Sequence, residues 1–153
     1  MDFLLDEELL ALRERAGRFA REELSDGREE EREESGAFNL EGWRRCAAFG
    51  LFRLPVARER GGSGGGLLAA ITVFEALGYS CPDTGLLFSA AAQLCGSVLP
   101  VDLFGTEEQR QRYLGPLMDG SIIGAQAITE PGRGSDVSGL ECRARVDGPD
   151  YVL

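Results

Sequence analysis

The sequence contains no histidine and no lysine among its 153 residues. Without histidine, the chain alone cannot form a Ser/His/Asp triad, a Cys/His pair or a histidine-ligated metal site, which removes most hydrolase mechanisms. Its basic residues are all arginine and number 16 against 26 acidic residues, giving a formal net charge of −10. Because nucleic-acid binding depends on clustered cations, this balance argues against a nucleic-acid partner.

Cysteine is also sparse, and long apolar runs are few. Cys46, Cys81, Cys95 and Cys142 are too far apart for the close pairs of zinc or redox motifs, so we expect free thiols and no metal site. The N-terminus, MDFLLDEELL, is acidic where a targeting peptide is basic. We see no apolar run approaching the roughly 18 residues of a membrane span. These features predict a cytoplasmic protein with no membrane partner.

What is present is the composition of a globular protein, with 43% hydrophobic and 27% charged residues. Much of the acid lies between Arg21 and Glu34, which we interpret as a solvated helix end or linker rather than an acidic interaction arm. From Asp2 to Leu24, apolar residues recur at helical spacing and line one face. Asn39 is expected to cap a short helix that ends at Gly50.

The next two segments are turns rather than regular elements. We interpret residues 50–55 as a buried extended connector, turned by Pro55. The glycine run Gly61–Gly66 invites a phosphate-loop interpretation, because glycine lets backbone N–H groups approach an anion. It has neither the preceding strand nor the Gly-Lys-Ser/Thr ending of a phosphate loop, so a flexible turn is favoured.

Further helices are predicted up to residue 119. One runs from Leu67 to Gly78, and a longer one from about Thr84 to Phe104 is apolar nearly all round, which places it centrally in a bundle. Thr106 and Gln109 form a capping box that starts a helix ending near Met118. Residues 1–119 are therefore predicted to form an α-helical domain.

Beyond Gly120 the pattern changes to strands. Apolar residues stand at 122, 123, 125, 127 and 128, then alternate with polar ones over 142–146, and residues 151–153 follow a Gly-Pro-Asp turn. Residues 120–153 are too few for a sheet with its own core, so we predict a partial β domain that something else completes. The predicted fold class is mainly α, a helical bundle followed by the first strands of an incomplete β domain.

The segment Ala127–Asp136, AITEPGRGSD, carries the chemistry. Pro131 forbids further ladder pairing, while Gly132 and Gly134 allow a tight turn with exposed N–H groups. Such a turn can grip an anion or a heteroaromatic edge, although an ordinary strand-ending loop has the same features.

This segment resembles the acyl-CoA dehydrogenase signature, in which a small residue, an aliphatic, Thr/Ser and Glu precede two variable positions, a small residue, Gly, Ser/Thr and Asp. Residues 103–109, 113–117 and Gly120 also resemble the family's approach to that signature, as does the turn over 60–64. Arg133 departs from the pattern, since the family usually has a small residue there. Its guanidinium could meet a phosphate of FAD or of the acyl carrier, or could crowd the turn.

The resemblance implies FAD as the cofactor, with this chain supplying contacts and no catalytic residue. Gln126, Ile128 and Thr129 are expected to hydrogen-bond the isoalloxazine through backbone groups and the hydroxyl. Ser135 is expected near the FAD pyrophosphate and the pantetheine arm of the substrate. Glu130 is not taken as the catalytic base, because the family's base is a glutamate of the C-terminal helical domain.

The implied reaction converts an acyl thioester into a 2-enoyl thioester, by removal of the α-proton and transfer of the β-hydride to the flavin. Proton and hydride acceptors must lie on opposite sides of one bond, so this chain alone is expected to bind FAD poorly and to catalyse nothing. The implied partners are an acyl-CoA or acyl-carrier-protein thioester, the remaining dehydrogenase segment or subunit, and an electron acceptor such as an electron-transfer flavoprotein. An oligomer acting in fatty acid metabolism is implied as well.

Three hypotheses remain open from the sequence. The chain is a subunit of a split dehydrogenase, a fragment of a longer one, or a non-catalytic binding or assembly module derived from the same family. By resemblance, Phe88, Gln93 and Gly96 of the long apolar helix flank the acyl pocket, and bundle packing explains the same residues equally well.

Overall fold

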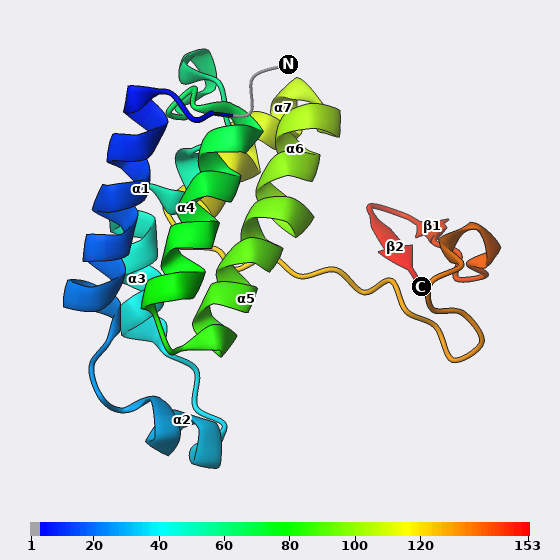
Figure 1. The fold of residues 1–153 in the computed structure, drawn as a ribbon. Coiled ribbons are helices and arrows are strands. Elements are labelled where there is room, and N and C mark those ends of the chain that lie inside the picture. Colours follow the sequence, from blue (N-terminus) through cyan, green and yellow to red (C-terminus); the bar gives the residue numbers. More distant parts are fainter. Residues whose placement is uncertain (1–3) are drawn as a thin grey trace.

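A computed structural model describes residues 4–153 of the chain (Figure 1). The first helix, α1 (Glu7–Phe19), begins where the Asp6 carboxylate accepts a hydrogen bond of 2.8 Å from the Leu9 amide. It continues through a π-helical turn, Ala20–Leu24. The predicted start at Asp2 is too early, because Asp6 caps the helix; residues 2 and 3 of that prediction lie outside the described residues.

The acidic stretch contains a helix that the sequence did not predict, α2 (Glu29–Ser35). Arg32 fastens it to the bundle: the guanidinium donates two hydrogen bonds of 2.9 Å to the Asp26 carboxylate. Its Nε lies 3.3 Å from the carboxylate of Asp83, the residue that caps a later helix. The stretch is therefore a solvated helix tied down at one residue.

Acidification is expected to loosen this attachment. The hydrogen bond from Arg32 lowers the pKa of Asp26 from its ordinary 3.8 to about 2. Because the pKa of Asp26 is lower in the folded than in the unfolded chain, the ionised carboxylate stabilises the fold at pH values above 3.8. This stabilisation is lost as the pH falls from 3.8 through about 2. The difference in free energy of unfolding between wild type and Asp26→Asn should shrink across that window in urea titrations. A difference that stays constant would contradict the assignment.

The predicted cap and end of α3 (Leu40–Phe49) are confirmed. Asn39 accepts a hydrogen bond of 2.8 Å from the Gly42 amide, and Gly50 adopts a left-handed φ of 89°. The predicted extended connector is wrong, because residues Leu51–Arg53 form a 3-10 turn. The left-handed Gly50 reverses the chain, and its carbonyl accepts from the Arg53 amide at 3.0 Å.

The glycine-rich turn folds back on the segment before it. The amides of Ser63, Gly64 and Gly65 donate to carbonyls of residues 53, 56 and 54 at 2.8–3.0 Å. A Cβ on Gly62 would lie 2.0 Å from the Val56 carbonyl oxygen, so only glycine fits this close approach. Backbone amides that a phosphate loop would need are thus bonded within the chain, in keeping with the predicted turn.

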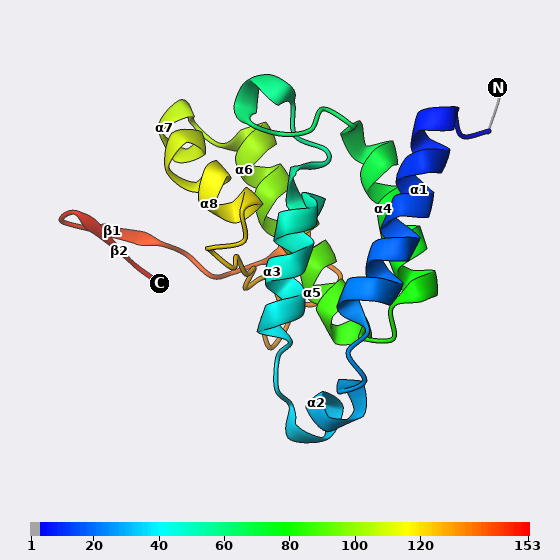
Figure 2. The same ribbon diagram turned by 90° about the vertical axis from the view of Figure 1, so that its left-hand side faces the viewer.

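Two long apolar helices each pack one side into the core of the bundle. The first, α4 (Gly66–Ser80), packs along α1 (Figures 1 and 2). The second is continuous over Thr84–Phe104 and comprises α5 (Thr84–Gln93), a π-helical turn (Leu94–Val98) and α6 (Leu99–Phe104). Both predicted helices are confirmed.

The Thr84–Phe104 helix has 21 residues and is apolar enough, by length and composition, to cross a membrane. The prediction that no apolar run approaches a membrane span is therefore wrong for this helix. A core helix of a soluble protein passes the same test, and one side of this helix packs into the hydrophobic core. The predicted central position is wrong, because the other side of the helix is exposed: Phe88, Leu103 and Phe104 are 77%, 59% and 84% exposed.

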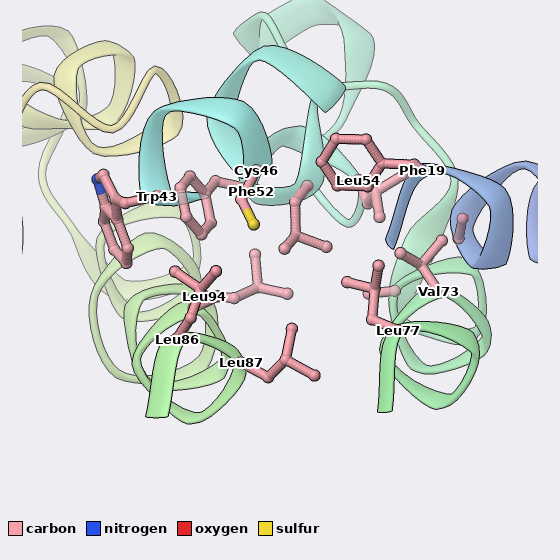
Figure 3. Close-up of a cluster of buried hydrophobic side chains, with 14 of the residues drawn as sticks. Phe19, Trp43, Cys46, Phe52, Leu54, Val73, Leu77, Leu86, Leu87 and Leu94 are labelled. Carbon is pink, nitrogen blue, oxygen red and sulfur yellow. The ribbon is translucent and has the colours of Figure 1, made fainter. Parts of the chain in front are cut away.

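The core lies between α1, α3, α4 and α5 (Figure 3). Its largest apolar side chains, each under 2% exposed, are Leu24, Trp43, Leu51, Phe52, Leu77, Leu86, Leu94 and Met118. The indole of Trp43 stacks at a tilt on Phe52, with ring centroids 4.7 Å apart. Its Nε1 donates a hydrogen bond of 2.9 Å to the Gly120 carbonyl, where the last helical segment has ended.

That last segment begins at the predicted capping box. In α7 (Glu107–Gln109), Thr106 accepts from the Gln109 amide and the Gln109 side chain accepts from the Thr106 amide. A π-helical turn, Arg110–Leu114, leads into α8 (Gly115–Met118).

Beyond Gly120 the chain leaves the bundle and ends in a small hairpin of β1 (Arg145–Asp147) and β2 (Asp150–Val152) (Figures 1 and 2). The strands are antiparallel, with Val146 paired to Tyr151. The prediction of a strand over 122–128 is wrong, because no other part of residues 4–153 pairs with that run. A mainly α fold followed by an incomplete β structure is confirmed.

Candidate functional site

Just past the Trp43–Gly120 hydrogen bond, the chain that leaves the bundle is held by a second buried side chain, Gln93, which is 1% exposed. Its amide nitrogen donates to the carbonyls of Leu117 and Ile122 at 2.9 and 2.8 Å. Its amide oxygen accepts from the Gly124 amide at 2.8 Å. A buried amide pays a desolvation cost unless such partners are present, so this side chain fixes where the run 122–124 lies.

The π-helical turn that follows Gln93 packs closely against the same run. A Cβ on Gly124 would fall 2.1 Å from the Ser97 hydroxyl oxygen, which no real structure tolerates without a shift. The side chain of Gln126 lies against Gly96, 3.4 Å from where a Cβ would stand. Gln126 is thus the first predicted flavin contact after the run leaves the bundle.

A tight turn follows the exposed run. Glu130 and Arg133 exchange two backbone hydrogen bonds of 3.0 Å across Pro131-Gly132. The Glu130 carboxylate accepts from the backbone amide of Glu141 at 3.0 Å and from that of Cys142 at 2.7 Å. Glu130 therefore closes the loop from 130 to 142.

Arg133 braces the same loop from inside. Its Nε donates a hydrogen bond of 2.9 Å to the Gly139 carbonyl, and its guanidinium lies 4.0 Å from the carboxylates of Asp136 and Glu141. A Cβ on Gly139 would lie 2.6 Å from that Nε, so glycine makes room for the arginine. In place of the family's usual small residue, this chain has a side chain folded onto its own loop.

The four predicted cofactor contacts lie on the two sides of this turn. Gln126, Ile128 and Thr129 belong to one extended, exposed run, and the structure brings them together there. Ser135 lies past the turn, in the exposed bend before the 3-10 turn Val137–Gly139.

Replacing Glu130 with glutamine is expected to loosen the loop. Glutamine keeps one acceptor oxygen but turns an amide NH₂ toward backbone donors and removes the charge, and charge-assisted hydrogen bonds are the stronger kind. Hydrogen exchange at the Cys142 amide should accelerate about ten-fold. Glu108→Gln, the same chemical change at an exposed side chain far from the loop, should leave that rate unchanged. Equal exchange in Glu130→Gln and wild type would show that the carboxylate does not hold the loop.

Fold and site together define an α-helical domain joined to an exposed, strand-like edge that ends in a Thr-Glu-Pro-Gly turn. The family described as acyl-CoA dehydrogenase, N-terminal domain, matches residues 6–121. The chain belongs to the acyl-CoA dehydrogenase family.

Two curated relatives and one solved structure show how far the likeness extends. The chain is 36% identical to the probable acyl-CoA dehydrogenase YngJ of Bacillus subtilis over 153 residues, which is all of this chain and 40% of the relative. It is 37% identical to the L-prolyl-[peptidyl-carrier protein] dehydrogenase of Serratia sp., over all of this chain and 39% of that protein. The structure "PigA with FAD and proline" aligns with a TM-score of 0.89 at 37% identity, covering 100% of this chain and 40% of that one.

Sequence reasoning missed the roles of Gln93 and Glu130. The sequence alone suggests Gln93 only as a pocket-lining or packing residue. A glutamine in an otherwise apolar helix is nevertheless a signal, because its buried amide needs hydrogen-bond partners. Phe88, considered with it, is 77% exposed on the same helix. For Glu130 no signal was available, because its partners lie more than ten residues away and are backbone amides.

Proposed function

We propose that this chain supplies the flavin-facing edge of an FAD-dependent acyl-thioester dehydrogenase. The observation that carries the proposal is the exposed run with Gln126, Ile128 and Thr129, which leaves the bundle at Gln93 and ends in a braced turn. Family membership and the likeness to a structure that holds FAD support it.

The residues present fit a flat heteroaromatic ligand met edge-on. Backbone groups of residues 125–129 form no hydrogen bond to other described parts of the chain, so they remain available to a ligand. No atom lies within 4 Å of where a Cβ would stand on Gly132 or Gly134, which leaves open space at the turn. In this proposal Thr129 donates its hydroxyl to the isoalloxazine, and Ser135 lies by the pyrophosphate and the pantetheine arm.

When bound, FAD would accept the hydride from the β-carbon of the thioester. The residues of this chain would then bind and orient that group, and none would act as the base. Because Glu130 already accepts two backbone amides, its carboxylate serves the loop, in line with a base supplied outside residues 1–153. The chain spans about 40% of the length of the curated relatives it matches, so activity, substrate and partners belong to this proposal.

The substrate class has two candidates, an acyl-CoA and a thioester on a carrier protein. Relatives of similar identity over this whole chain are named for each: two for acyl-CoA, and one for a prolyl group on a peptidyl-carrier protein. We also propose that the chain divides into a helical domain over 1–119 and a partial β domain over 120–153. The complete enzyme would be a cytoplasmic oligomer that passes electrons to an acceptor such as an electron-transfer flavoprotein.

Purification of the native protein tests this function. We expect flavin absorbance in the visible spectrum, together with a mass that shows the remaining dehydrogenase sequence, either on a second chain or in the same one. A stable, colourless protein that takes up no added FAD would support the alternative, a non-catalytic binding or assembly module.

A further inference from the structure

We propose that Gln93, Gly96 and Ser97 form a seat that positions the flavin-facing run, with Gln93 as its positioning residue. The proposal rests on the proposed function. In this proposal the three residues, which belong to the helical bundle, orient the run that binds the cofactor.

Gln93 is fully satisfied by groups outside its own helix. Both protons of its amide nitrogen are donated, one to Leu117 at the end of α8 and one to Ile122, while its oxygen accepts from Gly124. Three bonds to two consecutive segments define both where the chain leaves α8 and how the run starts. A side chain that only filled space in the core would need no such partners.

The π-helical turn Leu94–Val98 starts at the very next residue. Such turns insert an extra residue into a helix and are frequent at functional sites. Here the turn contains Gly96 and Ser97, which lie against Gln126 and Gly124. The packing leaves no room for even one methyl group between Gly124 and Ser97.

Past the seat, the run has no second attachment until the turn. Within residues 4–153, no hydrogen bond ties 125–129 to the bundle, and the Glu130–Arg133 pair that follows bonds only within its own turn. The position of Gln126, Ile128 and Thr129 relative to the bundle therefore depends on the seat. A displacement of the seat must shift all three.

The test is Gln93→Met in the flavin-loaded enzyme that contains this chain. Methionine keeps the volume of the side chain and removes every hydrogen bond. We expect FAD affinity to fall about ten-fold and the flavin absorbance band to shift, because donors of the run move relative to the ring. Gln111→Met is the matched control: Gln111 is exposed and bonds only the Glu107 carboxylate, at 3.1 Å. It should leave both quantities unchanged.

A second pair of variants keeps the proposal testable if Gln93→Met does not fold. Gly124→Ala should weaken FAD binding and shift the same band, and adding Ser97→Gly should restore both by removing the clashing side chain. A wild-type enzyme that holds FAD, with Gln93→Met or Gly124→Ala indistinguishable from it, overturns the seat and leaves the proposed function intact. A wild-type enzyme that binds no FAD overturns the proposed function, and the seat's role with it.

Discussion

Replacing Trp43 with alanine is expected to lower the free energy of unfolding by about 4 kcal/mol. The indole is 1% exposed, and its ring packs on Phe52 at a centroid distance of 4.7 Å and on Phe38 at 5.9 Å. Its removal leaves a cavity in the core and an unbonded carbonyl at Gly120, where α8 has ended. Urea denaturation followed by circular dichroism measures the loss.

Trp43→Phe separates the two contributions. Phenylalanine keeps an aromatic ring between Phe38 and Phe52 but cannot donate to the Gly120 carbonyl. The free energy of unfolding should therefore fall less than in Trp43→Ala, and the missing hydrogen bond accounts for about 1 kcal/mol of that fall. The remainder of that loss measures the imperfect fit of the smaller ring. A loss under about 1 kcal/mol for Trp43→Ala would show that the indole is not central to the core.

Replacing Thr129 with alanine in the flavin-loaded enzyme is expected to weaken FAD binding about 10- to 100-fold. In the proposed contact, the methyl of alanine would leave a polar atom of the flavin without its partner, and an unpaired buried polar group costs more than the bond contributes. The flavin spectrum should change as well, because hydrogen bonds to the ring tune its electronics. Titration with FAD and visible absorbance give both quantities.

Thr129→Ser is the control, because it keeps the hydroxyl and deletes only a methyl group. It should retain most of the affinity and the wild-type spectrum. Unaltered FAD affinity and spectrum in Thr129→Ala would remove Thr129 from the flavin contacts.

Local signals in the sequence predicted the helices well where one or two residues determine the local geometry. Asn39 and the Thr106–Gln109 capping box each satisfy backbone amides that a helix start leaves free, so their positions identify helix starts. Gly50 marks a helix end because a left-handed φ suits glycine. The apolar composition of Thr84–Phe104 predicts a helix there but not its position, because one of its apolar sides is exposed.

Two of the failures depend on contacts distant in sequence, and the third follows from a local chain reversal. Helix α2 is rich in glutamate with no apolar face, and its attachment depends on Arg32 meeting Asp83 from another part of the chain. The run 122–128 has strand-like residues, but a strand exists only through a paired neighbour. Residues 51–53 follow a chain reversal at Gly50, which turned an expected extended connector into a 3-10 turn.

The candidate site shows the same division. The motif from Ala127 to Asp136 can be recognised from its sequence pattern, and Pro131 and the glycines predict the turn that it forms. What holds the motif in place, namely Gln93 on one side and the Glu130 carboxylate on the other, depends on partners far along the chain. Spacing alone does not specify such contacts.

The central claim is that the turn containing Thr129 and Ser135 contacts FAD, with Thr129 at the isoalloxazine ring and Ser135 near the pyrophosphate. A structure of the native, flavin-containing assembly tests it most directly, through the distance from the Thr129 hydroxyl oxygen to the flavin. The account predicts a hydrogen bond of about 3 Å. A flavin held elsewhere, with Thr129 facing solvent, would contradict it.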